Sequence, residues 1–330
     1  MLFRIMLVLL ILFPLRIVAA EIEMEAGQEI ADPYWFKQSF LELEDDASEA
    51  AEENRQVLLY FHQKGCPYCY AMVRNNFLDP QLSGFIRDHF DVISLNIWGD
   101  REVTLADGSV LSEKALAEKW KIQYTPTLVF LKPTGEAGLR IDGYRPKAVF
   151  SKILDYVVSG NQDTPLSQLL IEKSASSMYS QPYLLSTQAM VAVEDQPKAL
   201  LVEYPGCKSC NDFHTDLLAR PDVNAQLKYF AVARIDATSD QRAVFPDGRT
   251  MPAADWVREA GLSYFPSLIL YDRSGQEQLR IDSYVRAFHL NSALEYVSAG
   301  HFERYKSFQR YISDKADHMR ESGQAVLLTE

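Results

Sequence analysis

Short apolar runs of strand length alternate along this chain with stretches whose apolar residues recur at helical spacing. In the first half, strands are predicted at residues 56–61, 90–97, 127–131 and 139–141, and helices at 111–120 and 146–158. A further helix is expected through residues 71–73, with Pro67 tolerated in its first turn. The predicted order is strand, helix, strand, helix, two strands, helix.

The second half repeats this order. Strands are expected at residues 199–204, 229–235, 268–271 and 279–281, and helices at 253–260 and 286–298. The sequence itself recurs: residues 139–144 (LRIDGY) return as 279–284 (LRIDSY), and 155–160 (DYVVSG) as 295–300 (EYVSAG), both displaced by 140 (279 − 139). Solenoid repeats are only about 20–50 residues long, so this period indicates a duplicated domain. The predicted fold class is α/β, with two tandem domains that each hold a central mixed sheet flanked by helices.

The first 20 residues have the pattern of a secretory signal peptide. A short start containing Arg4 precedes an apolar run over residues 5–15, and the small residues Ala19 and Ala20 precede the acidic Glu21. The run is shorter than the ~20 residues that a membrane span needs. We therefore expect cleavage near residue 20 and export to the periplasm; an uncleaved anchor, flanked by Arg16, is the alternative.

Composition fits an ordinary globular protein, with 47% hydrophobic and 24% charged residues. We expect a first domain at residues 21–160, a linker at 161–180, a second domain at 181–300 and a helical tail at 301–330. The stretch 98–110 is acidic and contains glycine, so we interpret it as a solvated loop ahead of a helix. A net charge of −12 argues against nucleic acid as a partner.

All four cysteines lie in two Cys-x-x-Cys pairs, Cys66 with Cys69 and Cys207 with Cys210. Two intervening residues put both sulfurs within bonding reach on the first turn of a helix, where the helix dipole and free backbone N–H groups stabilise a thiolate. This favours a reversible redox pair. A permanent disulfide is the first alternative, although a two-residue loop would stabilise the fold little. A zinc site built from both pairs is the second, but it would require the two domains to face each other sulfur to sulfur, so no metal is expected.

The chain resembles the thioredoxin superfamily, and most closely the periplasmic SoxW-like thioredoxins. The resemblance is carried by residues 65–69 (GCPYC), 95–100 (LNIWGD), 125–128 (TPTL) and 308–312 (FQRYI). It covers the first domain nearly whole and the second more loosely. The resemblance implies two thioredoxin-like domains and a thiol–disulfide oxidoreductase that needs no cofactor.

In the family's mechanism, Cys66 attacks a substrate disulfide and Cys69 resolves the mixed disulfide. Cys207 and Cys210 would take the same roles in the second domain. The resemblance also implies that Thr125-Pro126 and Phe265-Pro266 are cis, lie against the CxxC pairs and free a backbone edge that pairs with the substrate. An ordinary proline at a strand entry is the alternative.

The family's aspartate, six residues before the nucleophile, is replaced here by Tyr60. His62 stands four residues before Cys66, and Glu203 four before Cys207, so both are candidates for proton transfer. A surface polar residue at a strand end explains either position equally well. The second motif contains Lys208, whose charge would stabilise a thiolate at Cys207, so we expect the two sites to differ in potential or partner.

The expected function is reduction of protein or small-molecule disulfides by an exported enzyme. A reductase in an oxidising compartment needs electrons, and the implied donor is a membrane thiol carrier of the DsbD or CcdA kind. An isomerase or oxidase is the alternative within the same chemistry. A binding or chaperone module with inert disulfides is the alternative from another class.

Overall fold

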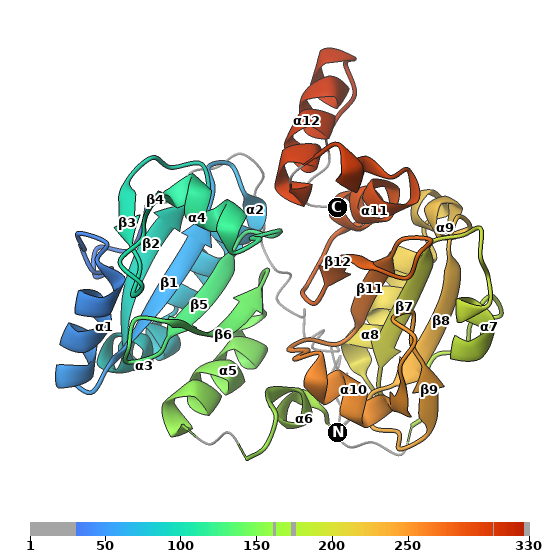
Figure 1. Cartoon of the computed structure of the whole chain (residues 1–330), viewed down its shortest axis with the longest axis horizontal. Coiled ribbons are helices and arrows are strands. Elements are labelled where there is room, and N and C mark those ends of the chain that lie inside the picture. Colours follow the sequence, from blue (N-terminus) through green and yellow to red (C-terminus); the bar gives the residue numbers. More distant parts are fainter. Residues whose placement is uncertain (1–30, 161–162, 173–175, 306, 327–330) are drawn as a thin grey trace, which may run out of the picture.

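The computed structural model describes residues 31–160, 163–172, 176–305 and 307–326. Two four-stranded sheets lie side by side, each flanked by helices (Figure 1). The predicted α/β class with two tandem domains is confirmed. The predicted signal peptide, residues 1–20, lies outside the described residues.

The sheet of the first domain has the strand order β2-β1-β5-β6. Central strand β1 runs parallel to β2 and antiparallel to β5, and β5 runs antiparallel to β6. The strands are β1 (Gln56–His62), β2 (Phe90–Asn96), β5 (Thr127–Leu131) and β6 (Ala137–Asp142). The helices are α1 (Leu43–Glu52), α2 (Pro67–Met72), α3 (Pro80–His89), α4 (Glu113–Lys119) and α5 (Lys147–Ser159).

The second domain repeats this arrangement with the strand order β8-β7-β11-β12. Its strands are β7 (Lys198–Glu203), β8 (Ala231–Asp236), β11 (Ser267–Tyr271) and β12 (Glu277–Ile281). Its helices are α7 (Thr187–Val191), α8 (Lys208–Asp212), α9 (Pro221–Leu227), α10 (Ala253–Glu259) and α11 (Ala287–Ser298). In both domains a π-helical turn follows the CxxC helix: η1 (Val73–Phe77) after α2 and η2 (Phe213–Leu218) after α8.

The prediction of a plain loop over residues 98–110 is wrong. It contains β3 (Glu102–Thr104) and reaches β4 (Val110–Ser112), which pair antiparallel, and β9 (Arg242–Val244) and β10 (Thr250–Pro252) repeat the hairpin in the second domain. Three-residue strands are too short to show the alternating pattern that identifies a strand. The turn is closed by Asp107, whose carboxylate accepts the N–H of Ser109 at 2.9 Å.

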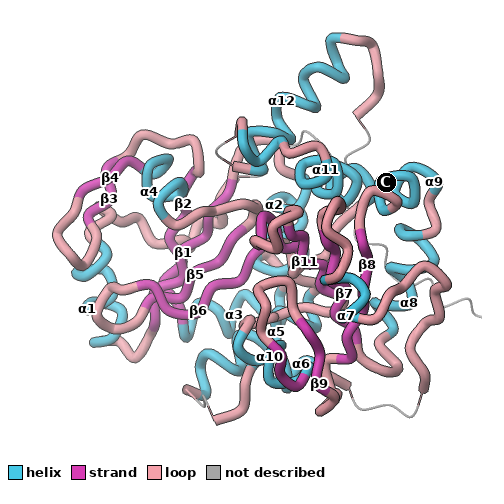
Figure 2. Tube along the Cα trace, turned by 45° about the vertical axis from the view of Figure 1, so that its right-hand side comes forward, coloured by secondary structure: helices cyan, strands magenta, loops and turns pink. Residues whose placement is uncertain are grey.

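The segments that follow each domain reach across to the other one. Helix α6 (Leu166–Leu170) follows the first domain, and its buried Leu166 and Leu170 belong to a hydrophobic cluster that is continuous from the first sheet into the second. Helix α12 (Phe308–Glu321) follows the second domain and lies above the junction between the two (Figures 1 and 2). None of the helices in the described part of the chain is long and apolar enough to cross a membrane.

Residues that the duplication makes equivalent meet each other at this junction. The ring of Tyr144 lies 6.1 Å from that of Tyr284, and the Tyr284 N–H donates to the Tyr144 carbonyl at 3.4 Å. Gly143 (φ 79°) approaches Ser283 so closely that an added Cβ would lie 2.5 Å from the Ser283 Cβ. The same patch of both repeats therefore forms the contact, as in a symmetric dimer.

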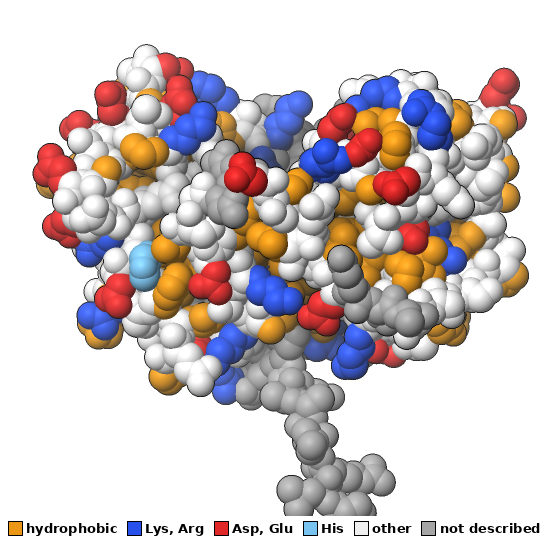
Figure 3. All heavy atoms as spheres, turned by 90° about the horizontal axis from the view of Figure 1, so that it is seen from below, with side chains coloured by type: hydrophobic (Ala, Val, Ile, Leu, Met, Phe, Trp, Pro, Cys, Tyr) orange, Lys and Arg blue, Asp and Glu red, His pale blue; other side chains and the backbone are white. Residues whose placement is uncertain are grey.

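Arg145 is the largest fully buried side chain at the junction, with 0% of its surface exposed. Its guanidinium donates to the Asp142 carbonyl at 2.7 Å and to Ser263 Oγ of the second domain at 2.7 Å. Asp282 Oδ2 lies 3.6 Å away. A buried cation with these partners fixes the first domain against the second. On the face in Figure 3, by contrast, Lys, Arg, Asp and Glu side chains lie interspersed.

Candidate active sites

The first CxxC pair lies where β1 ends and α2 begins. Cys66 is the N-cap residue of α2, and its Sγ accepts the backbone N–H of Cys69 at 3.1 Å. Pro67 occupies the first helical position, where no N–H is needed. Cys66 and Cys69 form a disulfide with a Cα–Cα distance of 5.2 Å, and they are 7% and 5% exposed. A backbone N–H at a helix N-terminus is thus already aimed at the sulfur that would carry negative charge after reduction.

The second pair has the same local geometry. Cys207 is the N-cap residue of α8, its Sγ accepts the Cys210 N–H at 3.1 Å, and the two form a disulfide. Cys207 is only 2% exposed. The Lys208 side chain, 90% exposed, extends toward Asp212 with 3.8 Å between the charged atoms. Its charge is therefore offset on the surface of α8.

Both predicted cis prolines are confirmed, because Thr125-Pro126 and Phe265-Pro266 are cis peptide bonds. In the first domain, the carbonyl oxygen and Oγ1 of Thr125 each lie 3.4 Å from Cys66 Sγ. In the second, Ser209 Oγ donates to the Phe265 carbonyl at 2.8 Å and lies 3.4 Å from Cys207 Sγ. The structure thus places each proline segment beside its CxxC pair, while its role in binding substrate stays a prediction.

The two candidates for proton transfer have different surroundings. His62 ends β1 and stacks on Tyr60 with ring centroids 5.3 Å apart, and burial lowers the pKa of His62. The Tyr60 hydroxyl, at the position of the family's aspartate, donates to the Cys69 carbonyl at 3.3 Å. Their part in proton transfer stays a prediction.

Glu203 is 1% exposed, at the end of β7, and its carboxylate is bound by two side chains. His214 Nε2 lies 2.9 Å from Glu203 Oε1, and Arg234 Nη1 lies 3.4 Å from Oε2. The interpretation of Glu203 as a surface residue at a strand end does not fit this burial. His214 was not singled out from the sequence, because only the helical path of α8 and η2 brings it back over β7.

A family model of the thioredoxin-like domain matches residues 43–158 and again residues 186–298. The chain belongs to the thioredoxin-like domain family. Each of its two domains carries a CxxC pair at the helix N-terminus and a neighbouring cis proline. The narrower SoxW-like assignment stays a prediction, and no curated protein matches the chain.

Solved structures with similar folds align with parts of the chain. A thioredoxin-fold protein from Helicobacter pylori is 16% identical over 42% of this chain and 92% of its own, with a TM-score of 0.35. A thioredoxin from Thermus thermophilus is 31% identical over 34% of this chain and 81% of its own, with a TM-score of 0.28. The C-terminal domain of Neisseria meningitidis DsbD is 14% identical over 36% of this chain and 93% of its own, with a TM-score of 0.26.

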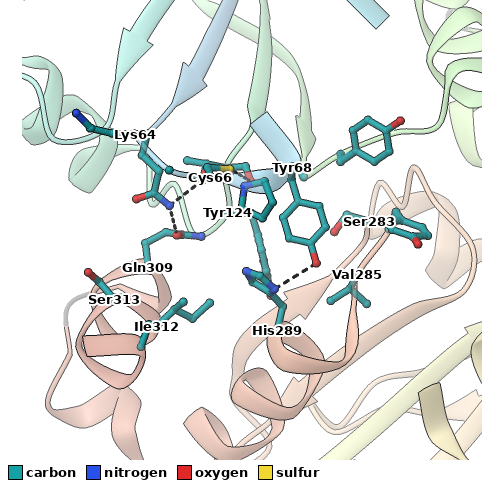
Figure 4. A pocket seen from close by; sticks show the side chains of 18 of the residues that line it. Lys64, Cys66, Tyr68, Tyr124, Ser283, Val285, His289, Gln309, Ile312 and Ser313 are labelled. Carbon is teal, nitrogen blue, oxygen red and sulfur yellow. Dashed lines mark hydrogen bonds between the residues drawn. The ribbon is translucent and has the colours of Figure 1, made fainter. Parts of the chain in front are cut away.

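The first thioredoxin-like domain does not form its site alone, because Tyr68 of the CPYC motif is held by the second domain. Its hydroxyl accepts the backbone N–H of Arg286 at 2.9 Å and lies 3.2 Å from His289 Nδ1 (Figure 4). Since the Tyr68 oxygen already accepts from Arg286, its own proton is directed to Nδ1, which requires a neutral imidazole. Burial lowers the pKa of His289 to about 3, which is consistent with that state.

A second contact comes from the tail through Gln63, three residues before Cys66. Gln63 Nε2 donates to Thr125 Oγ1 at 3.0 Å and to Gln309 Oε1 of α12 at 2.6 Å. Gln63 Oε1 accepts from Trp98 Nε1 at 2.7 Å. Sequence reasoning missed Gln63, His289 and Gln309 as site residues. The one signal that pointed to the tail was the presence of residues 308–312 (FQRYI) among the segments that carry the family resemblance.

Acidification should weaken the fold through His289. The unfolded imidazole takes up a proton near pH 6.5, whereas the folded one stays neutral down to about 3. The unfolded state therefore binds more protons in this window, and stability falls as pH falls, by at most about 1.4 kcal/mol per pH unit. Because the ring is half-buried, we expect the free energy of unfolding to fall by about 1 kcal/mol per pH unit.

Denaturant unfolding at pH 7 and pH 5 should show this loss in the wild type and in the exposed control His318→Gln, but not in His289→Gln. Equal pH slopes for the wild type and His289→Gln would contradict the assignment.

Proposed function

We propose that this protein is an exported, periplasmic thiol–disulfide oxidoreductase that reduces disulfides at Cys66 and Cys69. The observation that carries the proposal is the position of Cys66 Sγ. It accepts a helix N-terminal N–H from Cys69 at 3.1 Å and lies 3.4 Å from the Thr125 carbonyl beside cis-Pro126. The proposed location rests on the signal-peptide pattern of residues 1–20.

The reaction begins with the reduced pair. The Cys66 thiolate attacks one sulfur of the substrate disulfide, a Cys66–substrate disulfide forms and the other substrate sulfur leaves as a thiolate. Cys69 then loses its proton, attacks Cys66 Sγ and releases the second substrate thiolate. The substrate gains two electrons, and the pair is left as the Cys66–Cys69 disulfide seen in the structure.

The attacking thiolate is stabilised by groups already in place. The Cys69 N–H stabilises negative charge on Cys66 Sγ before it attacks the substrate, and again when the pair is re-reduced. Thr125 Oγ1, 3.4 Å from the same sulfur, is a second donor. To turn over, the pair must be re-reduced by a dithiol donor, for which we propose a membrane thiol carrier of the DsbD or CcdA type.

A redox titration tests whether both pairs are reversible. Equilibration against glutathione or dithiothreitol should give two two-electron steps, with potentials roughly between −270 and −120 mV. Cys207→Ser and Cys66→Ser variants assign each step to a domain, because each variant leaves one titratable pair. A first pair that stays oxidised well below about −300 mV is a structural disulfide, and the proposed activity then fails.

A further inference from the structure

Helix α12 lies along the segment that precedes cis-Pro126. Gln309 Nε2 donates to the Gln123 carbonyl at 3.0 Å, and the Phe308 N–H donates to Gln123 Oε1 at 2.8 Å. The rings of Phe308 and Tyr124 are 5.5 Å apart. The two hydrogen bonds join the first domain to the tail, between residues that are 185 and 186 positions apart in the sequence.

A second group of contacts holds the first turn of α12 in this position. Arg310 Nη2 lies 3.1 Å from Glu118 Oε1, and the Arg310 guanidinium lies over the Trp98 ring at 4.8 Å. Together with the Gln63–Gln309 bond, they tie α12 to both sides of the site. Helix α12 therefore occupies the backbone edge at Gln123 and covers the Tyr124 ring, directly before Thr125 and cis-Pro126.

The segment that follows the first domain, here called its C-terminal arm, contacts the second domain as α12 contacts the first. This arrangement therefore belongs to the repeat. Residues 167–171 (SQLLI) correspond to 308–312 (FQRYI), with Gln168 matching Gln309 at the displacement of the cysteines, 141 (309 − 168 and 207 − 66). Gln168 and Tyr204 line one cavity, and the Glu172 N–H donates to the Tyr204 hydroxyl. Tyr204 is the counterpart of Gln63. Each repeat thus sends its C-terminal arm to the loop before the other repeat's CxxC.

An extended substrate segment would need the edge that α12 occupies. A polypeptide strand binds an exposed sheet or loop edge through its main chain, by adding itself to that edge. The Gln123 carbonyl already accepts from Gln309, and the Tyr124 ring is covered by Phe308. A protein disulfide held in a strand can therefore reach this edge only if α12 is displaced.

The space beside Cys66 is a cavity of about 130 Å³, with Cys66 on one side and Val285, His289 and Ile312 on the other (Figure 4). A disulfide that is not part of a polypeptide strand has no need of the edge that α12 occupies.

We propose that the first site selects low-molecular-weight disulfides, because α12 excludes disulfides presented by an extended protein strand. This rests on the proposed function and names its substrate class. The exchange is the one written above: two electrons pass from the Cys66–Cys69 dithiol to the small disulfide, which leaves as two thiols, and a dithiol donor re-reduces the pair.

The exclusion by α12 can be measured on the full chain with the second pair removed (Cys207→Ser/Cys210→Ser) and dithiothreitol as donor. Gln309→Ala/Arg310→Ala should raise kcat/KM for insulin roughly tenfold, because several hydrogen bonds that hold α12 are lost. In Glu118→Ala, which removes a contact of α12 outside the cavity, the rate with 3,3′-dithiodipropionate should change less than twofold. Arg304→Ala, in the same tail but over the Tyr305 ring, is the matched control and should behave as the parent.

Glu118→Ala keeps the result interpretable if the double variant folds poorly. Glu118 is half-exposed and frees Arg310 without touching the cavity, so insulin reduction should rise in the same direction by a few fold. If the parent reduces insulin as fast as both α12 variants, α12 does not exclude protein disulfides and the proposal is overturned.

Failure of the proposed function looks different, because then neither insulin nor any small disulfide is reduced and the first pair resists titration.

Discussion

Replacing Cys66 with Ser is expected to abolish disulfide reduction at the first site, whereas Cys69→Ser should accumulate a mixed disulfide with substrate. Cys66 lines the cavity and carries the helix N-terminal hydrogen bond, so it is the sulfur that meets substrate. Without Cys69 nothing resolves the adduct, and turnover stops after one attack. Activity assays and intact-mass analysis of the adduct measure both results.

The second CxxC pair, Cys207 and Cys210, provides a comparison with the first pair in the same chain. In Cys207→Ser/Cys210→Ser chains the contrast between Cys66 and Cys69 variants should persist in full. At the second site Ser209 and Pro266 line a cavity of about 460 Å³, but Cys207 is not among its lining residues and is 2% exposed. Adducts at Cys207 in a Cys210→Ser chain should therefore form more slowly than adducts at Cys66 in a Cys69→Ser chain. Trapping by Cys66→Ser in place of Cys69→Ser would mean that the roles are inverted.

Arg145→Met should lower the free energy of unfolding by about 3–5 kcal/mol, the usual cost of removing one partner of a buried ion pair. Arg145 is fully buried and bridges the Asp142 carbonyl to Ser263 Oγ. Burial lowers the pKa of Arg145 and raises the pKa of Asp282, so each charge depends on the other. Denaturant unfolding measures the loss, and the first site should lose activity as the Tyr68 contacts loosen.

Arg140→Met is the matched control. Arg140 also lies beside an aspartate, Asp142 at 2.7 Å, and donates to the Trp120 and Lys121 carbonyls, but it is 31% exposed, so we expect a smaller loss than for Arg145→Met. The double variant Arg145→Met/Asp282→Asn should recover part of the stability, because it no longer leaves an unpaired buried carboxylate. If Arg145→Met cost no more than Arg140→Met, the buried guanidinium would not be what fixes the two domains together.

The strands and the redox pairs could be predicted from the sequence because local patterns specify them. Four consecutive apolar residues, 128–131, identify β5, and Pro67 after Cys66 identifies the start of α2. The repeat of residues 139–144 as 279–284 made the second domain predictable from the first. The short hairpin of β3 and β4 was missed, because three residues show no period.

The sequence by itself determined which chemistry the chain can carry: two thioredoxin-like folds, two CxxC pairs and two prolines beside them. The tertiary structure alone decided what surrounds the sulfurs. Tyr68 meets His289 across 221 residues, Gln63 meets Gln309 across 246, and Arg145 meets Ser263 across 118. Each is a polar side chain whose pattern predicts only a surface residue, since its partner is set by how two separately specified domains pack. Domain packing is a non-local outcome of shape and burial, and no spacing along the chain records it.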